Sequence, residues 1–211
     1  MKQRPYKEVE TLRQEFQERR GAIRQRLVDF ATVKPDNYFY ELAYCLLTPQ
    51  SSAINATLAV ERLKAAGLAE RDIDTAAILS RRDSYIRFHN TKARHLSEAK
   101  RSFREIMRAI NNGYSAMELR KWLVQNVKGL GWKEASHFLR NIGHHDLAIL
   151  DRHILKNLKR HNVIRSLPTT LTPKRYLAIE HRFNIFADAI GITMDELDLL
   201  FWSRETGEIL K

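Results

Sequence analysis

The chain has 211 residues, of which 44% are hydrophobic and 29% charged, a composition typical of globular proteins. This length is sufficient for one large domain or two small lobes around a buried core. A single cysteine, Cys45, excludes intramolecular disulfides and cysteine-based metal clusters. The net charge of +11 favours a polyanionic partner, because basic side chains placed on phosphates release condensed counterions. A charge that serves only solubility is the alternative.

The first ten residues, MKQRPYKEVE, are polar and charged, unlike a secretory signal peptide. No apolar run approaches the roughly 20 residues that span a bilayer. We therefore expect a soluble, cytoplasmic protein that is not secreted and does not contact a membrane.

Apolar residues at helical spacing dominate the N-terminal part of the chain. Residues 9–30 predict an amphipathic helix, with Val9, Leu12, Phe16, Ile23, Leu27 and Phe30 on its apolar face. Residues 39–47 predict a more buried helix. This helix should break at Thr48-Pro49, because proline disfavours a helical conformation in the residue before it.

Helical spacing continues over residues 54–63, and Gly67 is a plausible stop. A long helix is predicted after Asn90, ended by the Asn-Asn-Gly sequence at 111–113.

Two capping boxes predict further helix starts, one from Ser115 to Glu118 and one from Thr193 to Glu196. No strand alternation, internal repeat or low-complexity linker is present. The sequence therefore predicts an all-α fold.

The helices suggest two lobes. Residues 35–82 would form the smaller lobe, and residues 1–34 together with 83–211 the other. A cleft between two helical lobes is a natural place for a site.

The segment 127–140 carries the most chemical information. A helix is predicted to end near Asn126, a Gly-x-Gly turn follows at Gly129 and Gly131, and another helix begins near Trp132. Glycine permits positive φ and close backbone approach, and amides beside a helix N-terminus suit a phosphate. By itself, the pattern fits an ordinary tight turn better than a binding site.

The residues around this turn resemble the helix-hairpin-helix motif, which grips one DNA strand through backbone amides. The matching sequence is V-K-G-L-G-W-K-E-A, and it places Lys133 directly after the turn. Eighteen residues later, an apolar run delivers Asp151 to the start of another helix. This pair of residues, at this spacing, resembles the catalytic lysine and aspartate of helix-hairpin-helix DNA glycosylases with lyase activity.

Several other runs resemble the archaeal-type 8-oxoguanine DNA glycosylases, from about residue 37 to the last residue. These runs are KGLGWKEASHFLRNIG, LAILDRHILKNL, and residues 46–51, 87–93 and 201–211. The resemblance implies a two-lobed helix-hairpin-helix glycosylase fold with its active site in the cleft. It also implies an enzyme of base excision repair that removes 8-oxoguanine and then cleaves the strand by β-elimination.

The resemblance implies a catalytic pair. The free amine of Lys133 would attack the sugar C1′, displace the base and leave a Schiff base. Asp151 would stabilise oxocarbenium-like charge and help to manage the proton of the lysine. The ordinary alternatives are a solvated surface lysine and an aspartate that only caps a helix.

Base recognition is implied for three residues. The terminal Lys211, with its carboxylate, would distinguish 8-oxoguanine from guanine, because only the oxidised base carries an N7–H donor. Trp202 and Phe88 would stack on the flipped base. Their alternatives are a frayed end for Lys211, a core position for Trp202 and a hydrophobic staple for Phe88.

The expected partner is damaged double-stranded DNA, bound by a nucleoid-associated monomer. Gln50 follows Pro49 in a loop that resembles the wedge filling the gap left by the flipped nucleotide. The DNA backbone would be gripped at the turn by Lys128, Gly129 and Gly131.

No metal ligand set is expected, because the eight histidines are scattered. His137 lies four residues after Lys133 but lacks partners at ligand spacing. No cofactor is required by the implied chemistry. A structural monovalent cation at the hairpin is the one ion that the resemblance allows.

Two other functions fit parts of the pattern. A non-catalytic helix-hairpin-helix module explains the charge and the turn, but not Lys133, Asp151 and the C-terminus together. The other alternative is a glycosylase of the same fold that acts on a different lesion, such as an oxidised pyrimidine or a mispaired adenine, because the identity of the substrate rests chiefly on the resemblance in the last eleven residues. A purely hydrolytic enzyme would lack the lysine after the hairpin.

Overall fold

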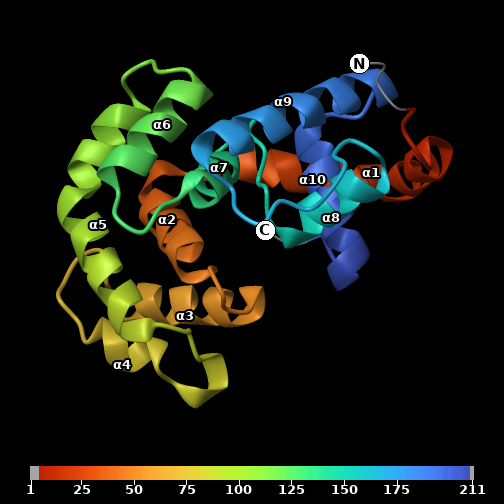
Figure 1. Cartoon of the computed structure of the whole chain (residues 1–211). Coiled ribbons are helices and arrows are strands. Elements are labelled where there is room, and N and C mark those ends of the chain that lie inside the picture. Colours follow the sequence, from red (N-terminus) through yellow and green to blue (C-terminus); the bar gives the residue numbers. More distant parts are fainter. Residues whose placement is uncertain (1–4, 210–211) are drawn as a thin grey trace. The chain divides into compact units, whose positions relative to one another are not determined.

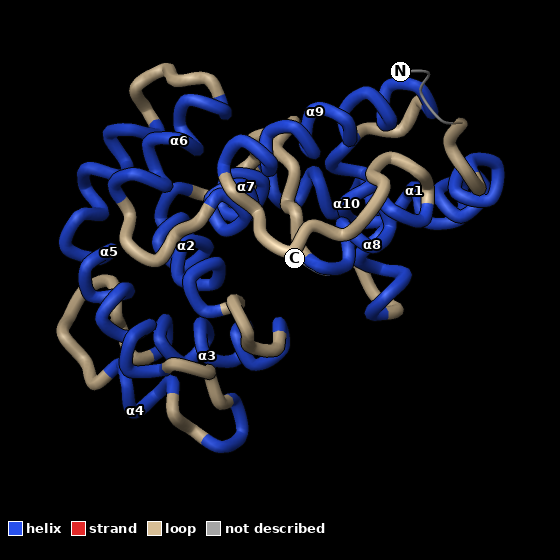
Figure 2. The backbone as a smooth tube through the Cα atoms, in the orientation of Figure 1, coloured by secondary structure: helices blue, strands red, loops and turns tan. Residues whose placement is uncertain are grey.

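The computed structural model describes residues 5–209, and every regular element in that range is helical (Figure 1). Figure 2 shows these helices joined by loops and turns. The all-α prediction is therefore confirmed. In chain order the elements are α1 (Val9–Ala31), η1 (Pro35–Asn37), α2 (Tyr38–Leu47), α3 (Ala53–Ala65), α4 (Thr75–Leu79), η2 (Arg82–Ser84), α5 (His89–Ile110), α6 (Ala116–Asn126), α7 (Trp132–Asn141), α8 (Arg152–Arg160), α9 (Pro173–Ile190) and α10 (Met194–Thr206).

The helix ends follow from local sequence chemistry. Both predicted capping boxes are present: the Ser115 hydroxyl accepts from the Glu118 amide, and the Glu118 carboxylate accepts from the Ser115 amide. The same exchange joins Thr193 and Glu196 at the start of α10. These bonds satisfy amides that would otherwise lack a partner in the first turn, so each helix begins where the sequence indicates.

By their contacts, the residues form two compact units. One unit is Val33–Phe138, and the other combines Met1–Thr32 with Leu139–Lys211. The start of the first unit agrees with the expected boundary, but residues 83–138 group with 33–82 instead of with the N-terminal helix. The reason is that α5 packs against α2 and α4, so the long helix joins the smaller predicted lobe.

In the unit Val33–Phe138, α2 is the central helix. Every residue from Phe39 to Leu47 is buried, and both α3 and α5 pack against it. A helix that is buried on all sides is enclosed by other elements, and most of the buried side chains of α2 are apolar. The turn that follows α2 and the start of α5 are therefore attached to one packed core.

In the other unit, α10 contacts α1, α8 and α9. Its buried Asp198 accepts a hydrogen bond of 3.1 Å from Arg140, and the Arg140 guanidinium lies 4.5 Å from the Phe30 ring centroid. A buried ion pair with this geometry fixes the register of α10, and with it the position of Trp202.

Candidate functional site

The predicted hairpin lies between α6 and α7, as expected. Gly129 has φ +89°, and a Cβ at this position would collide with the ring of His95 on α5. Gly131 does not have positive φ, which corrects half of the expectation. A Cβ at Gly131 would lie 2.8 Å from Glu134 Oε2, at the end of a side chain that can move. Gly129 is thus required by both conformation and space, and Gly131 only by a close approach.

The start of α7 is fixed across the hairpin by Arg120 of α6. The Arg120 side chain is fully buried and donates to Ser136 Oγ at 3.1 Å. Its guanidinium also lies 4.9 Å from the Trp132 ring centroid. Because both contacts lie in the first turns of α7, they hold the backbone that carries Lys133.

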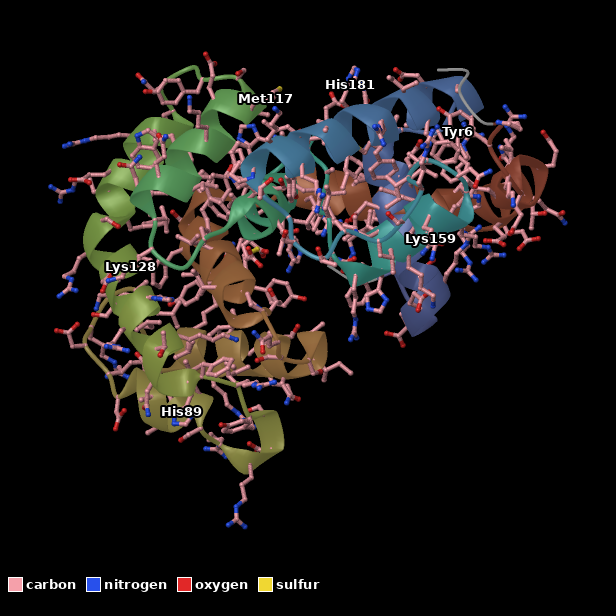
Figure 3. All side chains as sticks on the ribbon, viewed as in Figure 1. Tyr6, His89, Met117, Lys128, Lys159 and His181 are labelled. Carbon is pink, nitrogen blue, oxygen red and sulfur yellow. The ribbon has the colours of Figure 1, made fainter. Side chains whose placement is uncertain are left out.

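Lys133 is the second residue of α7, directly after the hairpin. Its side chain is 24% exposed, and Nζ lies 3.4 Å from Glu134 Oε1. The amine is therefore partly shielded from water without being fully buried. Lys128, labelled in Figure 3, is more open at 69% exposure, and its Nζ lies 3.6 Å from Glu98 Oε1 on α5.

Gln50 and Phe88 share an unusual backbone conformation. Gln50 has φ +56° and is exposed in the turn closed by the Ser51 amide and the Thr48 carbonyl. Phe88 has φ +60° at the N-cap of α5, and its side chain is 51% exposed. This exposure contradicts the staple alternative for Phe88. Positive φ in large residues costs free energy, and such strain is concentrated at functional sites.

Asp151 occupies the N-cap of α8, which confirms its capping role. Its Oδ1 atom accepts hydrogen bonds of 2.8 Å from both His153 N and Ile154 N. Its Oδ2 atom accepts a bond of 3.1 Å from Trp202 Nε1. Capping therefore uses one carboxylate oxygen, while the other is directed by an indole on α10.

The surroundings of Trp202 contain an ionic cluster that the sequence did not indicate. The His153 ring meets Trp202 edge to face at 5.8 Å, and His153 Nδ1 lies 3.4 Å from Glu205 Oε2. Lys156 also binds Glu205, and this hydrogen bond is the main reason that the Glu205 pKa is lowered. Trp202 is half-buried, so it is neither a core residue nor a freely solvated one.

The two predicted catalytic residues are described in separate units, Lys133 in Val33–Phe138 and Asp151 in the other. Within its own unit, Asp151 is joined to Trp202, and Gln50 and Phe88 belong to neighbouring segments of the first unit. Lys211 lies outside the described residues.

Sequence reasoning missed Lys92, which is buried one helical turn after Phe88 and donates to the turn that contains Gln50. Lys92 lies inside the run 87–93 that carries the family resemblance, but nothing in that run distinguishes a buried lysine from an ordinary surface lysine.

Among residues 5–209, no group of three or more His, Cys, Asp or Glu side chains could hold a metal ion. No described helix is long and apolar enough to cross a membrane.

Comparison with known proteins identifies close relatives. A family model described as 8-oxoguanine DNA glycosylase matches residues 23–192. A Fusobacterium nucleatum protein named 8-oxoguanine DNA glycosylase/AP lyase is 38% identical, over 98% of this chain and 97% of its own. A Methanocaldococcus jannaschii protein of the same name is 32% identical, over 97% of this chain and 98% of its own.

The solved structures that resemble this chain belong to the same family as these sequence relatives. The crystal structure of the M. jannaschii 8-oxoguanine DNA glycosylase matches with a TM-score of 0.86 and 31% identity, covering 96% of this chain and 95% of that one. The same enzyme in complex with a 15mer DNA containing 8-oxoguanine matches with a TM-score of 0.83 and 31% identity, covering 95% of this chain and 100% of that one. The chain therefore belongs to the 8-oxoguanine DNA glycosylase family, with the helix-hairpin-helix fold.

Proposed function

We propose that this protein is a bifunctional DNA glycosylase/AP lyase of base excision repair. It flips 8-oxoguanine out of duplex DNA, excises the base through a Schiff base on Lys133, and cleaves the strand by β-elimination. The observation that carries the proposal is the position of Lys133, a partly shielded amine in the first turn of α7, directly after a hairpin whose Gly129 is pressed against His95.

The amine of Lys133 supplies the nucleophile. Nζ bonds to the sugar C1′ as the C1′–N9 bond breaks, and the proton lost by the nitrogen goes to the departing base. Opening of the C1′–O4′ bond then gives an iminium ion. Loss of a C2′ proton expels the 3′ phosphate and breaks the strand, and water hydrolyses the imine to release Lys133.

Asp151 stabilises the positive charge that develops on the sugar. Its Oδ1 atom is held by two backbone amides, so the carboxylate cannot rotate away during the reaction. A charge that is preorganised in this way stabilises a transition state without reorganisation. Trp202 has two roles in this proposal, since its N–H directs Oδ2 and its ring face stacks on the base.

Phe88 supplies a second stacking surface, supported by its exposure, and Gln50 fills the gap in the duplex. A main-chain oxygen of Lys211 accepts a hydrogen bond from the N7–H of 8-oxoguanine, a donor that guanine lacks. The hairpin residues Lys128, Gly129 and Gly131 hold the DNA backbone.

The proposed enzyme acts as a monomer on damaged double-stranded DNA, and its net charge of +11 supports association with the nucleoid. The reaction requires no cofactor, because Lys133 provides both nucleophile and imine. A structural monovalent cation at the hairpin would have to be bound by backbone carbonyls, since the described residues offer no side-chain metal cluster. Because no divalent metal takes part in the proposed reaction, excision should persist in excess chelator.

The test is borohydride trapping on duplexes that carry 8-oxoguanine, thymine glycol or no lesion. Wild type should form a covalent adduct only with 8-oxoguanine, and Lys133→Gln should form none. Lys121→Gln, which alters an exposed lysine on α6, is the matched control and should trap normally. An adduct only with thymine glycol would keep the mechanism and reject the substrate. Tight DNA binding without any adduct would indicate a non-catalytic module.

A further inference from the structure

Lys92 on α5 is a buried cation with three oxygen acceptors. The residue is 6% exposed, and its Nζ donates to Leu47 O at 2.7 Å, to Pro49 O at 2.6 Å and to Ser51 Oγ at 3.2 Å. A buried ammonium group is costly unless its hydrogen bonds are satisfied. Here three acceptors match its three donors, and they lie at the end of α2 and in the turn that follows it.

The acceptors explain why a cation lies at this position. Leu47 is the last residue of α2, so its carbonyl has no partner within the helix. Pro49 lies in the turn itself, and its carbonyl precedes Gln50. A positive group favours the negative end of a helix dipole, and three directed bonds restrict the turn more than apolar packing would.

The same anchor extends to the segment before α5. Ser51 Oγ, which accepts from Lys92, also accepts from Arg87 N at 3.1 Å. Asn55 Nδ2 reinforces this contact by donating to Tyr85 O at 3.1 Å. The Gln50 turn and the segment leading to Phe88 are therefore fastened to each other around Lys92.

Lys92 also lies near the nucleophile. Burial is the main cause that lowers the pKa of Lys92 to about 8, the positive charge of Lys133 lowers it further, and Glu134 opposes both. The charges of Lys92, Lys133 and Glu134 are therefore coupled within the unit Val33–Phe138.

We propose that Lys92 is a positioning residue for base flipping, which holds the turn at 48–51 so that Gln50 can occupy the space left by the extruded nucleotide. This inference rests on the proposed function, and it assigns a separate step to a residue that does not touch the reacting atoms. Gln50 has φ +56°, a conformation that an unrestrained turn would tend to leave. Without Lys92, the turn would relax, and extrusion of a paired base would become harder.

The test compares two substrates for each variant in single-turnover reactions: 8-oxoguanine paired with cytosine, and a preformed abasic site. An abasic sugar has no base to unpair or unstack, so its cleavage depends less on flipping. Lys92→Met should slow excision of 8-oxoguanine about 10- to 100-fold, while abasic-site cleavage changes less than about threefold. The retained lyase activity shows, in the same sample, that the variant is folded.

Two further variants complete the design. Lys100→Met removes another hydrogen-bonded lysine of α5, whose partner is Asp72, and should leave both reactions unchanged. Ser51→Ala removes one acceptor without placing a new group in the core, so it provides a milder test if Lys92→Met fails to fold. It should slow excision about 3- to 10-fold and spare abasic-site cleavage.

Equal losses on the two substrates would overturn the proposal, because Lys92 would then act through Lys133 or through the fold as a whole. Unchanged excision of 8-oxoguanine in both Lys92→Met and Ser51→Ala would also overturn it. Failure of the wild type on 8-oxoguanine would instead reject the proposed function, so the two ideas fail separately.

Discussion

Trp202 donates its indole N–H to Oδ2 of Asp151 at 3.1 Å, so a predicted stacking residue directs a predicted catalytic carboxylate. The other oxygen of Asp151 is occupied by the amides of His153 and Ile154. In the proposed function, base binding and charge stabilisation are therefore linked through one aromatic side chain, and substitutions can separate the two contributions.

Trp202→Phe keeps an aromatic face but removes the hydrogen bond. We expect both 8-oxoguanine excision and abasic-site cleavage to slow by about 10- to 100-fold, because a hydrogen bond to a charged group contributes roughly 1.5–3 kcal/mol. Single-turnover rates on the two substrates provide the measurement. A loss confined to 8-oxoguanine would show that Trp202 acts only by stacking.

Asp151→Asn and Asp151→Ala separate capping from catalysis. Asparagine is as good an N-cap as aspartate, so Asp151→Asn should unfold within about 2 °C of wild type. Asp151→Ala should lose about 1 kcal/mol, which corresponds to roughly 2–4 °C in Tm for a chain of this size. Both variants should lose at least about 100-fold in excision rate, because both remove the charge. Full activity in Asp151→Asn would contradict the electrostatic role.

The two hairpin glycines should respond differently to substitution by alanine. Gly129→Ala requires a Cβ at φ +89° that collides with His95, so the hairpin must distort. We expect affinity for damaged and undamaged duplexes to fall alike, by about tenfold or more, since strain of this kind costs about 1–3 kcal/mol. Gly131→Ala should have a smaller effect, because the Glu134 side chain can move aside. Titrations of both variants at one fixed salt concentration decide between these outcomes, and the reverse order would contradict the geometry.

His161 makes stability depend on pH. Burial lowers its pKa below the ordinary value of 6.5, and the charge of Arg204 adds to this, whereas the hydrogen bond with the Lys7 carbonyl raises it. The unfolded chain therefore binds a proton at His161 more readily than the folded chain, and protonation favours unfolding. The contribution of His161 to stability is complete above pH 6.5 and decreases as the pH falls from 6.5 to the folded pKa.

Urea denaturation at several pH values tests this contribution in wild type and His161→Gln. The wild type should lose more stability than the variant between pH 7.5 and 5, and the difference between the two proteins isolates His161 from the other histidines. Parallel curves would show that His161 does not carry the dependence.

Local signals in the sequence predicted most of the helices. The boxes at Ser115 and Thr193 and the break at Thr48-Pro49 depend on neighbouring residues alone, so they were predictable and are confirmed. The short helix α4 was not assigned, because five residues are too few for a clear period. The long helix α9 was also missed, although Thr172 before Pro173 is a typical start signal.

The sequence by itself was enough to single out Lys133 and Asp151 as the candidate catalytic pair, because a lysine after a glycine turn and an aspartate before a helix are local patterns that resemble the family motif. Tertiary structure decided what those residues contact. The pairing of Asp151 with Trp202 joins positions 51 residues apart, and Lys92 reaches carbonyls 43 and 45 residues away. Helical periodicity states which side of a helix is apolar, but not which distant carbonyl or indole will face it. Such long-range hydrogen bonds arise only when whole helices pack, and here each of them joins distant segments within one unit.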